Sequence, residues 1–218
     1  DFMSQKSLEK MEGIYVPFWL YDYEASYDYV GEGIKVRSWT SGDTEYTETS
    51  YYEVIRDMKV DFDRIPVDAS YAMDDGIMDL MEPYQYQELK GFQPKYMSGF
   101  YGEVYNQGAP ELEGRAQVKA RNSSQEMMQA SLGEYNRVRP VRNDLQLSRN
   151  GVHYALMPVW QYLYQYRGQT YQYHVNGQTG KVIGTTPVSR GKVLSYAASV
   201  LAAVTAACYM VVWVLEIL

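Results

Sequence analysis

Residues near the start of the chain follow a period of two, with mostly aromatic residues at odd positions and mostly apolar residues at even positions. Between residues 15 and 23 one face of the predicted strand carries aromatic rings, and the other carries Val16, Phe18 and Leu20. This period of two predicts a β-strand that is buried on both faces where it begins. Gly31 and Gly33 are expected to break the strand, and 41–43 reads as a turn. The strands predicted for this part are 15–23, 34–40, 44–55 and 60–65.

The period lengthens to about 3.6 from residue 68, which predicts helices. The first contains Ile77 and Met81 on one face and ends at Pro83, and a second is expected to begin at Pro94. A third begins at Pro110 and ends before Gly133, and its narrow apolar stripe places it at the surface. The residues of that stripe are Leu112, Ala116, Ala120 and Met127.

Alternating runs return after residue 143. They are separated by three turn signals, 149–151, 167–168 and 176–177, each of which contains glycine. Such spacing predicts an antiparallel meander. Its strands are predicted at 144–148, 152–166, 170–175 and 181–184.

Two segments share the pattern proline, apolar, tryptophan, any residue, tyrosine, any residue, tyrosine. They begin at Pro17 and Pro158, and each is followed by a predicted hairpin and later by a Pro-Val pair. The repetition favours an internal duplication, although alternating aromatic runs also coincide by chance in β proteins. The predicted fold is therefore α+β, with two antiparallel β units, a helical insertion between them and a C-terminal transmembrane helix. The two β units are expected as two small sheets or as one sheet with a pseudo-twofold axis. The corresponding segments are a linker at 1–13, a first β unit at 14–67, the helical insertion at 68–142, the meander at 143–189 and the span at 193–215.

The last segment is apolar without interruption. Residues 193–215 carry no charge, and as a helix they would extend about 35 Å, enough to cross a hydrocarbon core of roughly 30 Å. A buried hairpin helix is the alternative, but such helices rarely stay uncharged for so long. Small residues four apart would permit close packing with a second helix in the membrane. These candidate helix-packing residues are Ser195, Ser199, Ala203 and Ala207.

The flanks of the span predict its orientation. Arg190 and Lys192 precede it and only Glu216 follows, so the positive-inside rule places the preceding domain in the cytoplasm. The expected location is the cell membrane, crossed once. The chain opens at Asp1 without a methionine, which leads us to expect further natural sequence before it.

Composition excludes several classes of function. The 218 residues carry a net charge of −7, which argues against nucleic acid as a partner because phosphates are bound by basic surfaces. The single cysteine, Cys208, lies inside the apolar span, so neither a disulfide nor a cysteine zinc site is expected within this sequence. The 23 tyrosines favour half-buried β surfaces, or a surface that binds other proteins.

Three runs of sequence resemble a bacterial family common in Gram-positive anaerobes. They are YVPFWLYDYEASYDYVGEGIKVRSWTSGDTEYTETSYYEVIRD, the IPVD at 65–68, and PVW followed later by NGQTGKVIGTTPVSRGK. Members of that family resemble membrane-anchored proteins with an N-terminal zinc ribbon of the transcription-factor-B type, and the family has no established activity. The resemblance implies a membrane anchor and a zinc ribbon. The paired cysteines of the ribbon have no counterpart in this sequence. Either the sequence starts after the ribbon, and zinc is expected in a missing N-terminal part, or this member lacks the ribbon.

Candidate chemistry is sparse. His153 and His174 are predicted on strands without a serine or cysteine nucleophile pattern beside them, so ordinary strand histidines are favoured. An acidic run could bind a hard cation through oxygen ligands, but its spacing is not that of a known calcium loop, and a solvated surface is favoured. This run contains Asp61, Asp63, Asp68, Asp74, Asp75 and Asp79, with Asp68 or Ser70 expected to cap the following helix. A basic cluster, Arg137, Arg139, Arg142 and Arg149, is expected in a solvated loop or against anionic lipid.

The function predicted from these patterns is a non-catalytic scaffold or adaptor at the inner membrane face. Its candidate contact surface is aromatic, because tryptophan and tyrosine are enriched where proteins bind one another. The alternative for these rings is a place in the core. The residues of this candidate surface are Trp19, Tyr21, Tyr23, Trp160, Tyr162 and Tyr164. Two other classes stay open, a nucleic-acid-associated protein that acts through a missing zinc ribbon and a metal-dependent enzyme that uses the acidic run.

Overall fold

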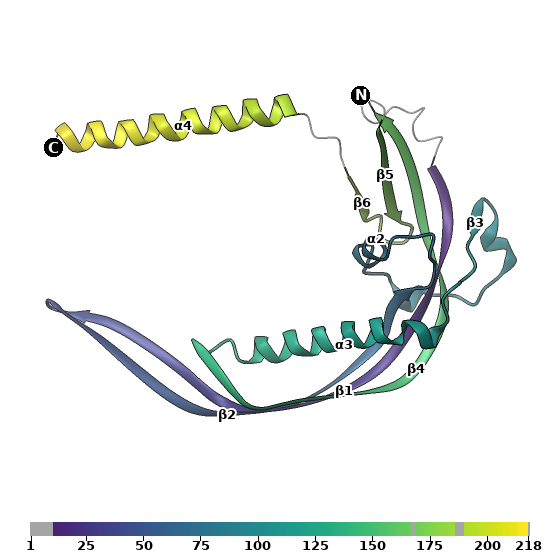
Figure 1. The fold of residues 1–218 in the computed structure, drawn as a ribbon, viewed down its shortest axis with the longest axis horizontal. Coiled ribbons are helices and arrows are strands. Elements are labelled where there is room, and N and C mark those ends of the chain that lie inside the picture. The colour runs from purple at the N-terminus through teal and green to yellow at the C-terminus, as the bar shows by residue number, and fades with distance from the viewer. Residues whose placement is uncertain (1–10, 167–168, 186–189, 218) are drawn as a thin grey trace.

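One long, curved sheet dominates the structure, a computed structural model that describes residues 11–166, 169–185 and 190–217 (Figure 1). The predicted combination of mostly antiparallel sheet, a few helices and a C-terminal apolar helix is confirmed. The strands lie in the order β2-β1-β4-β5-β6, and β3 pairs in parallel with β1 beside β2. Their bounds are β1 Met11–Ser41, β2 Thr44–Asp68, β3 Phe100–Gly102, β4 Arg137–Tyr166, β5 Gln169–Asn176 and β6 Val182–Gly184.

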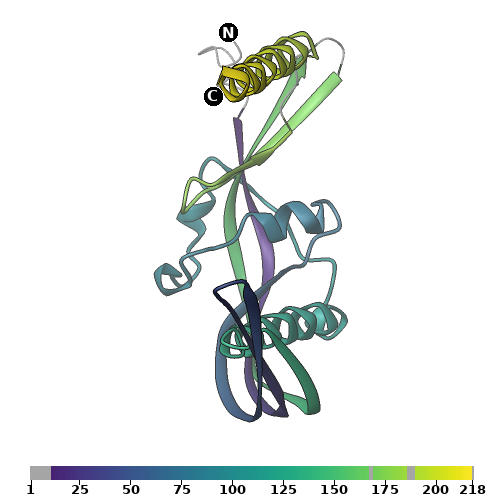
Figure 2. The same ribbon diagram turned by 90° about the vertical axis from the view of Figure 1, so that its left-hand side faces the viewer.

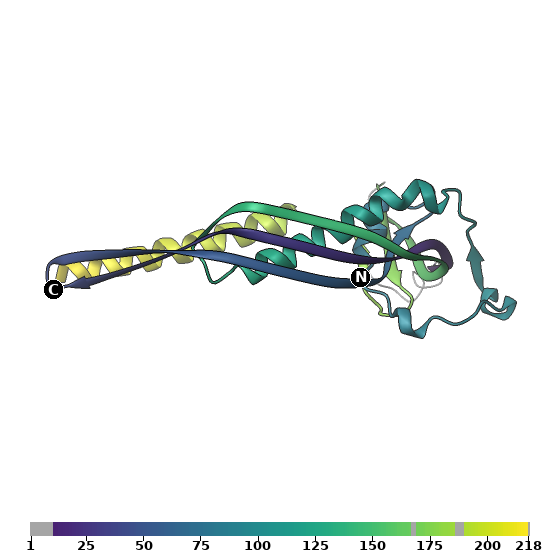
Figure 3. The ribbon, with the colours of Figure 1, turned by 90° about the horizontal axis from the view of Figure 1, so that it is seen from below.

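Strands β1, β2 and β4 are much longer than the sequence pattern predicted. β1 pairs with β2 from Phe18↔Asp68 to the turn after Ser41, and with β4 along almost its whole length, so the three ribbons run side by side (Figure 3). The predicted break at Gly31 and Gly33 is wrong. A Cβ on Gly33 would lie 2.6 Å from the ring of Tyr135, so glycine here makes room for an aromatic ring over an uninterrupted strand.

The sheet bends where both ladders of β1 are irregular. At Asp22 an extra residue is inserted on β2 and another on β4, and such bulges bend a strand and increase its twist. Asp22 accepts a hydrogen bond from the backbone N–H of Arg64 at 2.8 Å, and Arg64 has a positive φ of 60°. The predicted turn at 149–151 is wrong, because this glycine signal marks the bulge within β4.

Two helices and two short 3₁₀ helices join β2 to β4. Helix α2 covers Asp75–Leu80, the 3₁₀ helices cover Tyr86–Glu88 and Pro94–Met97, and α3 covers Ala109–Ser131. The helix predicted from Pro94 is wrong beyond one turn, since the chain extends into β3 and packs its aromatic residues on the sheet. Asp74, rather than Asp68 or Ser70, caps α2 by accepting from the N–H of Ile77 at 2.9 Å.

Helix α3 lies in the concavity of the curved sheet (Figure 1). The Glu111 carboxylate accepts from the Gly108 N–H at 2.8 Å, which satisfies one of the backbone donors at the start of the helix. The buried stripe repeats every four residues and covers the tyrosines of β1. It contains Leu112, Ala116, Ala120, Ser124 and Met128, so Met128 is buried where the sequence pattern had suggested Met127.

A second apolar cluster packs on the other face of β1 near its start. Val16, Phe18 and Leu20 lie against Met78 and Met81 of the α2 segment, together with Met157 and Val159 of β4. The sheet is therefore covered by α2 on one face and by α3 on the other. Burial on both faces, predicted for the start of β1, is confirmed.

The two aromatic repeats lie on neighbouring antiparallel strands of the same sheet. Pro17 pairs with Leu156, and Tyr15 pairs with Pro158, so the two prolines flank the central pair Val16↔Met157. The strands thus form one sheet rather than two separate β units.

Helix α4, Arg190–Ile217, lies apart from the sheet in Figure 1, and in Figure 2 it lies at the end of the molecule away from α3. Among the described residues, its segment Gly191–Met210 is the helix long and apolar enough to cross a membrane, and none of it is buried. Unlike the helices packed on the sheet, this segment therefore has no protein core to shelter its apolar surface.

Candidate functional site

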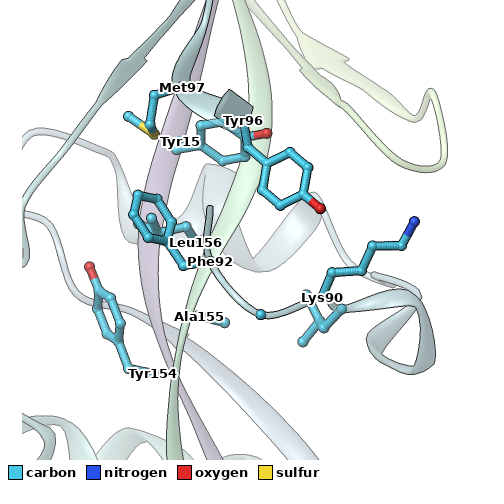
Figure 4. A pocket seen from close by; sticks show the side chains of 10 residues that line it. Tyr15, Lys90, Phe92, Tyr96, Met97, Tyr154, Ala155 and Leu156 are labelled. Carbon is cyan, nitrogen blue, oxygen red and sulfur yellow. The ribbon is translucent and has the colours of Figure 1, made fainter. Parts of the chain in front are cut away.

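A pocket of about 280 Å³ opens where the segment before β3 crosses the sheet (Figure 4). One wall is formed by Tyr15 of β1 and by Tyr154, Ala155 and Leu156 of β4. The opposite wall comes from the crossing segment, through Leu89, Lys90, Gly91, Phe92, Tyr96 and Met97. The Lys90 side chain extends away from the rings, so the pocket is mainly aromatic and apolar (Figure 4).

Strand register explains why these residues meet. Trp19 pairs with Tyr154 and Tyr15 pairs with Pro158, so alternate residues of β1 and β4 share one face. β3 places Phe100 over β1, where a Cβ on Gly13 would lie only 2.6 Å from the Phe100 ring. A glycine at position 13 is therefore what lets the crossing segment approach the sheet.

The rings in and around the pocket form two sets in contact, and Phe92 lines the pocket together with Tyr15 and Tyr154, one ring from each set. Phe100 lies 4.9 Å from Tyr15 and 4.8 Å from Trp160 between ring centroids. Trp19, Tyr105 and Tyr154 contact one another at 5.2–5.5 Å, and the Trp19 indole donates to the Gln107 carbonyl at 3.0 Å. We call this set of residues the aromatic face. It contains Tyr15, Trp19, Phe92, Phe100, Tyr105, Tyr154 and Trp160.

Much of the aromatic face is open to solvent. Phe92 is 64% exposed, Tyr105 47% and Tyr154 44%. Burial of its hydroxyl, followed by the charge of Tyr105, raises the pKa of Tyr154 above its usual 10.0, so this phenol is a neutral hydrogen-bond donor at physiological pH. Exposed, contiguous rings with a few polar atoms are typical of surfaces that bind protein side chains.

The predicted contact surface is divided by the fold. Tyr21 and Tyr23 are not on a surface, because α3 covers them and the Tyr21 hydroxyl donates to the Ala109 carbonyl at 2.6 Å. Trp19 and Trp160 belong to the aromatic face. Tyr162 and Tyr164 stack at 6.2 Å beside β5.

Several residues of the aromatic face were missed in the sequence. Phe92, Phe100 and Tyr105 fall in a segment whose prolines suggested helices, and nothing in its period indicated that it crosses the sheet. Tyr154 had a usable signal, since it lies six residues before Trp160 and therefore on the same face of a regular strand.

The acidic run does not converge on an open site. Asp68 and Asp75 contact Arg115 at 3.1 and 3.0 Å, and Asp79 contacts Lys119 at 2.7 Å. Burial raises the pKa of Asp68 from 3.8 to about 6, and Arg115 opposes this shift. These carboxylates therefore join α2 and β2 to α3, while Asp61 and Asp63 stay exposed on β2.

The described residues contain no group of three or more histidine, cysteine or acidic side chains arranged to hold a metal ion. His153 contacts Asp22 at 3.0 Å, and the buried His174 contacts the Gln172 side chain at 3.1 Å. His153 thus contacts a carboxylate and His174 contacts an amide. Neither of these two contacts gives the imidazole a serine or cysteine nucleophile to activate.

The predicted helix-packing stripe is exposed along α4. The Ser195 and Ser199 hydroxyls donate to carbonyls of their own helix, those of Lys192 and Tyr196, and Ala203 and Ala207 continue the same line. Arg190 and Lys192 lie in the first turn of α4, and the side chain of Arg190 is outside the described part of the structure.

Comparison with known proteins finds one relative without an assigned role. The chain is similar to YdjG, an uncharacterized protein of Bacillus subtilis strain 168. The two are 36% identical over 195 residues, which make up 89% of this chain and 57% of YdjG. The chain thus spans less than two thirds of the length of YdjG. No family model and no solved structure matches the present chain.

Proposed function

We propose that the protein is a non-catalytic binding protein, anchored in a membrane by α4, that captures a protein partner on its aromatic face. The observation that carries the proposal is the exposure of Phe92 and Tyr154, which line the pocket, and of Tyr105 beside Tyr154. Aromatic anchors in such pockets supply most of the binding energy in many protein interfaces.

The pocket suits one or two side chains better than a large flat partner. Its volume of about 280 Å³ is at the lower limit of ligand sites, and its walls are rings and methyl groups. An aromatic or aliphatic side chain of an extended peptide would fill it, and the Tyr154 hydroxyl could donate to a peptide carbonyl.

Photo-crosslinking tests the proposal. A photoreactive phenylalanine analogue replaces Phe92 in the full chain in its native membrane, and the same analogue at Tyr71, which is 72% exposed against 64% for Phe92, is the control. We expect one protein adduct at position 92 that is absent at position 71. Purified, that partner should bind the Tyr105→Ala chain roughly thirtyfold more weakly, the effect of losing about 2 kcal/mol at a hot spot. Equal adducts at both positions would count against the aromatic face.

We also propose that the soluble part lies in the cytoplasm, on the basis of Arg190 and Lys192 before the span. In a Cys208→Ala background, an impermeant maleimide should label Tyr71→Cys only after intact cells are opened. Labelling of unopened cells would reverse the orientation.

The resemblance to zinc-ribbon proteins leads to a second proposal, that the natural chain carries a ribbon before residue 1. The match covers 57% of YdjG, so the other 43% has no counterpart in this chain and leaves room for such a domain. Metal analysis of the natural full-length protein should then find zinc, and its absence would remove this proposal.

The local symmetry about Val16↔Met157 supports an origin by duplication of one β unit, which we propose for the two aromatic repeats.

A further inference from the structure

The curved sheet has two long edges along which none of the described strands pairs. β2 is an edge strand along its whole length, and β5 covers β4 only from Val159 onward, which leaves the edge from Arg137 to Met157 open. Long edges of this kind are templates for pairing with another chain.

The two edges carry opposite charge. On β2, between residues 53 and 63, the exposed acids Glu53, Asp57, Asp61 and Asp63 outnumber the single exposed base Lys59. On β4, between residues 137 and 149, the exposed bases Arg137, Arg139, Arg142 and Arg149 outnumber the single exposed acid Asp144. The sheet is thus acidic at one edge and basic at the other.

The edges also span the same level of the sheet. Glu32 of β1 pairs with Glu53 on one side and Arg139 on the other, and Val30 pairs with Ile55 and Arg142. Since β2 and β4 are both antiparallel to β1, they run parallel to each other. A second copy can therefore place residues 53–63 of its β2 beside residues 137–149 of the first copy's β4 in a parallel ladder, provided that it is rotated so that its β3 does not overlap β5 of the first copy.

We propose that copies of this chain associate head to tail, with β4 of one copy pairing along β2 of the next. Arg139 then lies opposite Glu53 of the neighbouring copy. One level brings Asp144 beside Asp57, but the diagonal neighbours of that pair are Arg142 and Lys59, within reach of both carboxylates.

Charge selects this arrangement over its alternatives. A twofold pair of β2 edges would set acid against acid, and a twofold pair of β4 edges would set arginine against arginine, which is unfavourable directly across a ladder. Contacts between two different surfaces repeat from copy to copy, and they extend into an open array unless the rotation between copies closes a ring. All copies point the same way, as helices α4 entering one membrane require.

Exposed apolar residues agree with the pairing. Ile55 on β2 is 61% exposed and Val141 on β4 is 81% exposed. Both lie at the level of Val30 of β1. Val30 pairs with Ile55, and Val141 is the inserted residue of a second bulge in β4, opposite Val30 and Gly31. Head-to-tail pairing would remove both side chains from water together.

Disulfide crosslinking of the full chain tests the arrangement. In a Cys208→Ala background, Glu53→Cys and Arg139→Cys are combined in one chain. Within a chain these positions flank β1, about 10 Å apart, which is beyond the reach of a disulfide. Oxidation in proteoliposomes should therefore give a ladder of dimers, trimers and larger species.

Three controls fix the interpretation. Moving the first cysteine to Asp61 shifts it by about 27 Å along the strand and should reduce crosslinking at least tenfold. Either cysteine alone should give no more crosslinked dimer than the Cys208→Ala parent, because dimers from one cysteine would mean a twofold edge pair and overturn the proposal. Absence of the ladder in the double variant would overturn it as well.

Charge reversal gives an independent readout by sedimentation of the full chain in detergent. Arg139→Glu and Glu53→Arg should each reduce association at least tenfold, while an equimolar mixture of the two variants should recover it. Arg121→Glu on the exposed face of α3 carries the same charge change and should leave association unchanged. Failure of the mixture to recover, with both variants folded by circular dichroism, would refute the pairing.

Discussion

Tyr21 and Tyr29, both covered by α3, differ in whether the hydroxyl group has a hydrogen-bond partner. Replacement by phenylalanine should therefore destabilise the protein at Tyr21 but not at Tyr29. Tyr21 is fully buried, and its hydroxyl donates to the Ala109 carbonyl at 2.6 Å in the first turn of α3. Tyr29 is 4% exposed on the same face of β1, but no described group lies within hydrogen-bonding distance of its buried hydroxyl. Phenylalanine at either position keeps the ring and its apolar contacts.

The expected magnitudes follow from the hydrogen bonds. Tyr21→Phe loses a neutral hydrogen bond, which contributes about 1 kcal/mol to the free energy of unfolding. Tyr29→Phe removes a polar atom that was taken out of water without compensation, so stability should be unchanged or higher by up to about 1 kcal/mol. Burial raises the pKa of Tyr21 to about 12 and that of Tyr29 above 10.0, so both phenols are neutral at pH 7.

The assay is urea unfolding of the full chain in detergent at pH 7, followed by tryptophan fluorescence. In a protein of this size, 1 kcal/mol corresponds to about 2–4 °C in melting temperature, which a thermal scan would check. If Tyr29→Phe cost as much as Tyr21→Phe, the Tyr29 hydroxyl would have a hydrogen-bond partner in solution and the reasoning would be refuted.

Three further substitutions probe the core. Met128→Ala should destabilise the chain by about 2–4 kcal/mol in urea unfolding, while the exposed neighbour Met127→Ala should stay within about 0.5 kcal/mol. Arg115→Met should cost about 3 kcal/mol or more because it leaves the buried Asp68 carboxylate without its counter-charge, and adding Asp68→Asn should recover most of the loss. Burial lowers the pKa of His174 below 6.5, so its contribution to stability is complete above pH 6.5 and declines as the pH falls further; His174→Gln should flatten the pH profile of the midpoint in that range.

Local signals in the sequence were sufficient where a residue's role is set by its neighbours along the chain. The turn predicted at 41–43 joins β1 to β2, with Gly42 at a φ of 62°. Helix α3 begins at Ala109, one residue before the start that Pro110 and the acidic first turn predicted. The apolar span at the C-terminus forms one helix. In each of these cases backbone preference and hydrophobic period point to the same structure.

Distant contacts explain what the sequence did not reveal. The rings of Tyr29 and Tyr135 occupy the space above Gly31 and Gly33, so glycines that read as a break lie in a continuous strand. Asn150 is the inserted residue of the bulge opposite Asp22 and Tyr23. This bulge depends on how β4 pairs with β1, which the local sequence does not reveal. For the same reason the aromatic face was only partly visible. Trp19 and Trp160 stood out by their repeat, whereas Phe92 reaches the site through a segment with no regular period.

The aromatic face and the sheet edges use different parts of the same strands. Tyr154 and Arg139 both lie on β4, fifteen positions apart in sequence, which corresponds to about 50 Å of extended strand. Edge pairing at residues 137–149 of β4 would therefore leave the pocket open and repeat it once in each copy of the assembly. A partner with several aromatic segments would then bind by avidity, because each further contact is made at a high effective concentration. It follows that Arg139→Glu should leave the affinity for a monovalent peptide unchanged while weakening the capture of a multivalent one.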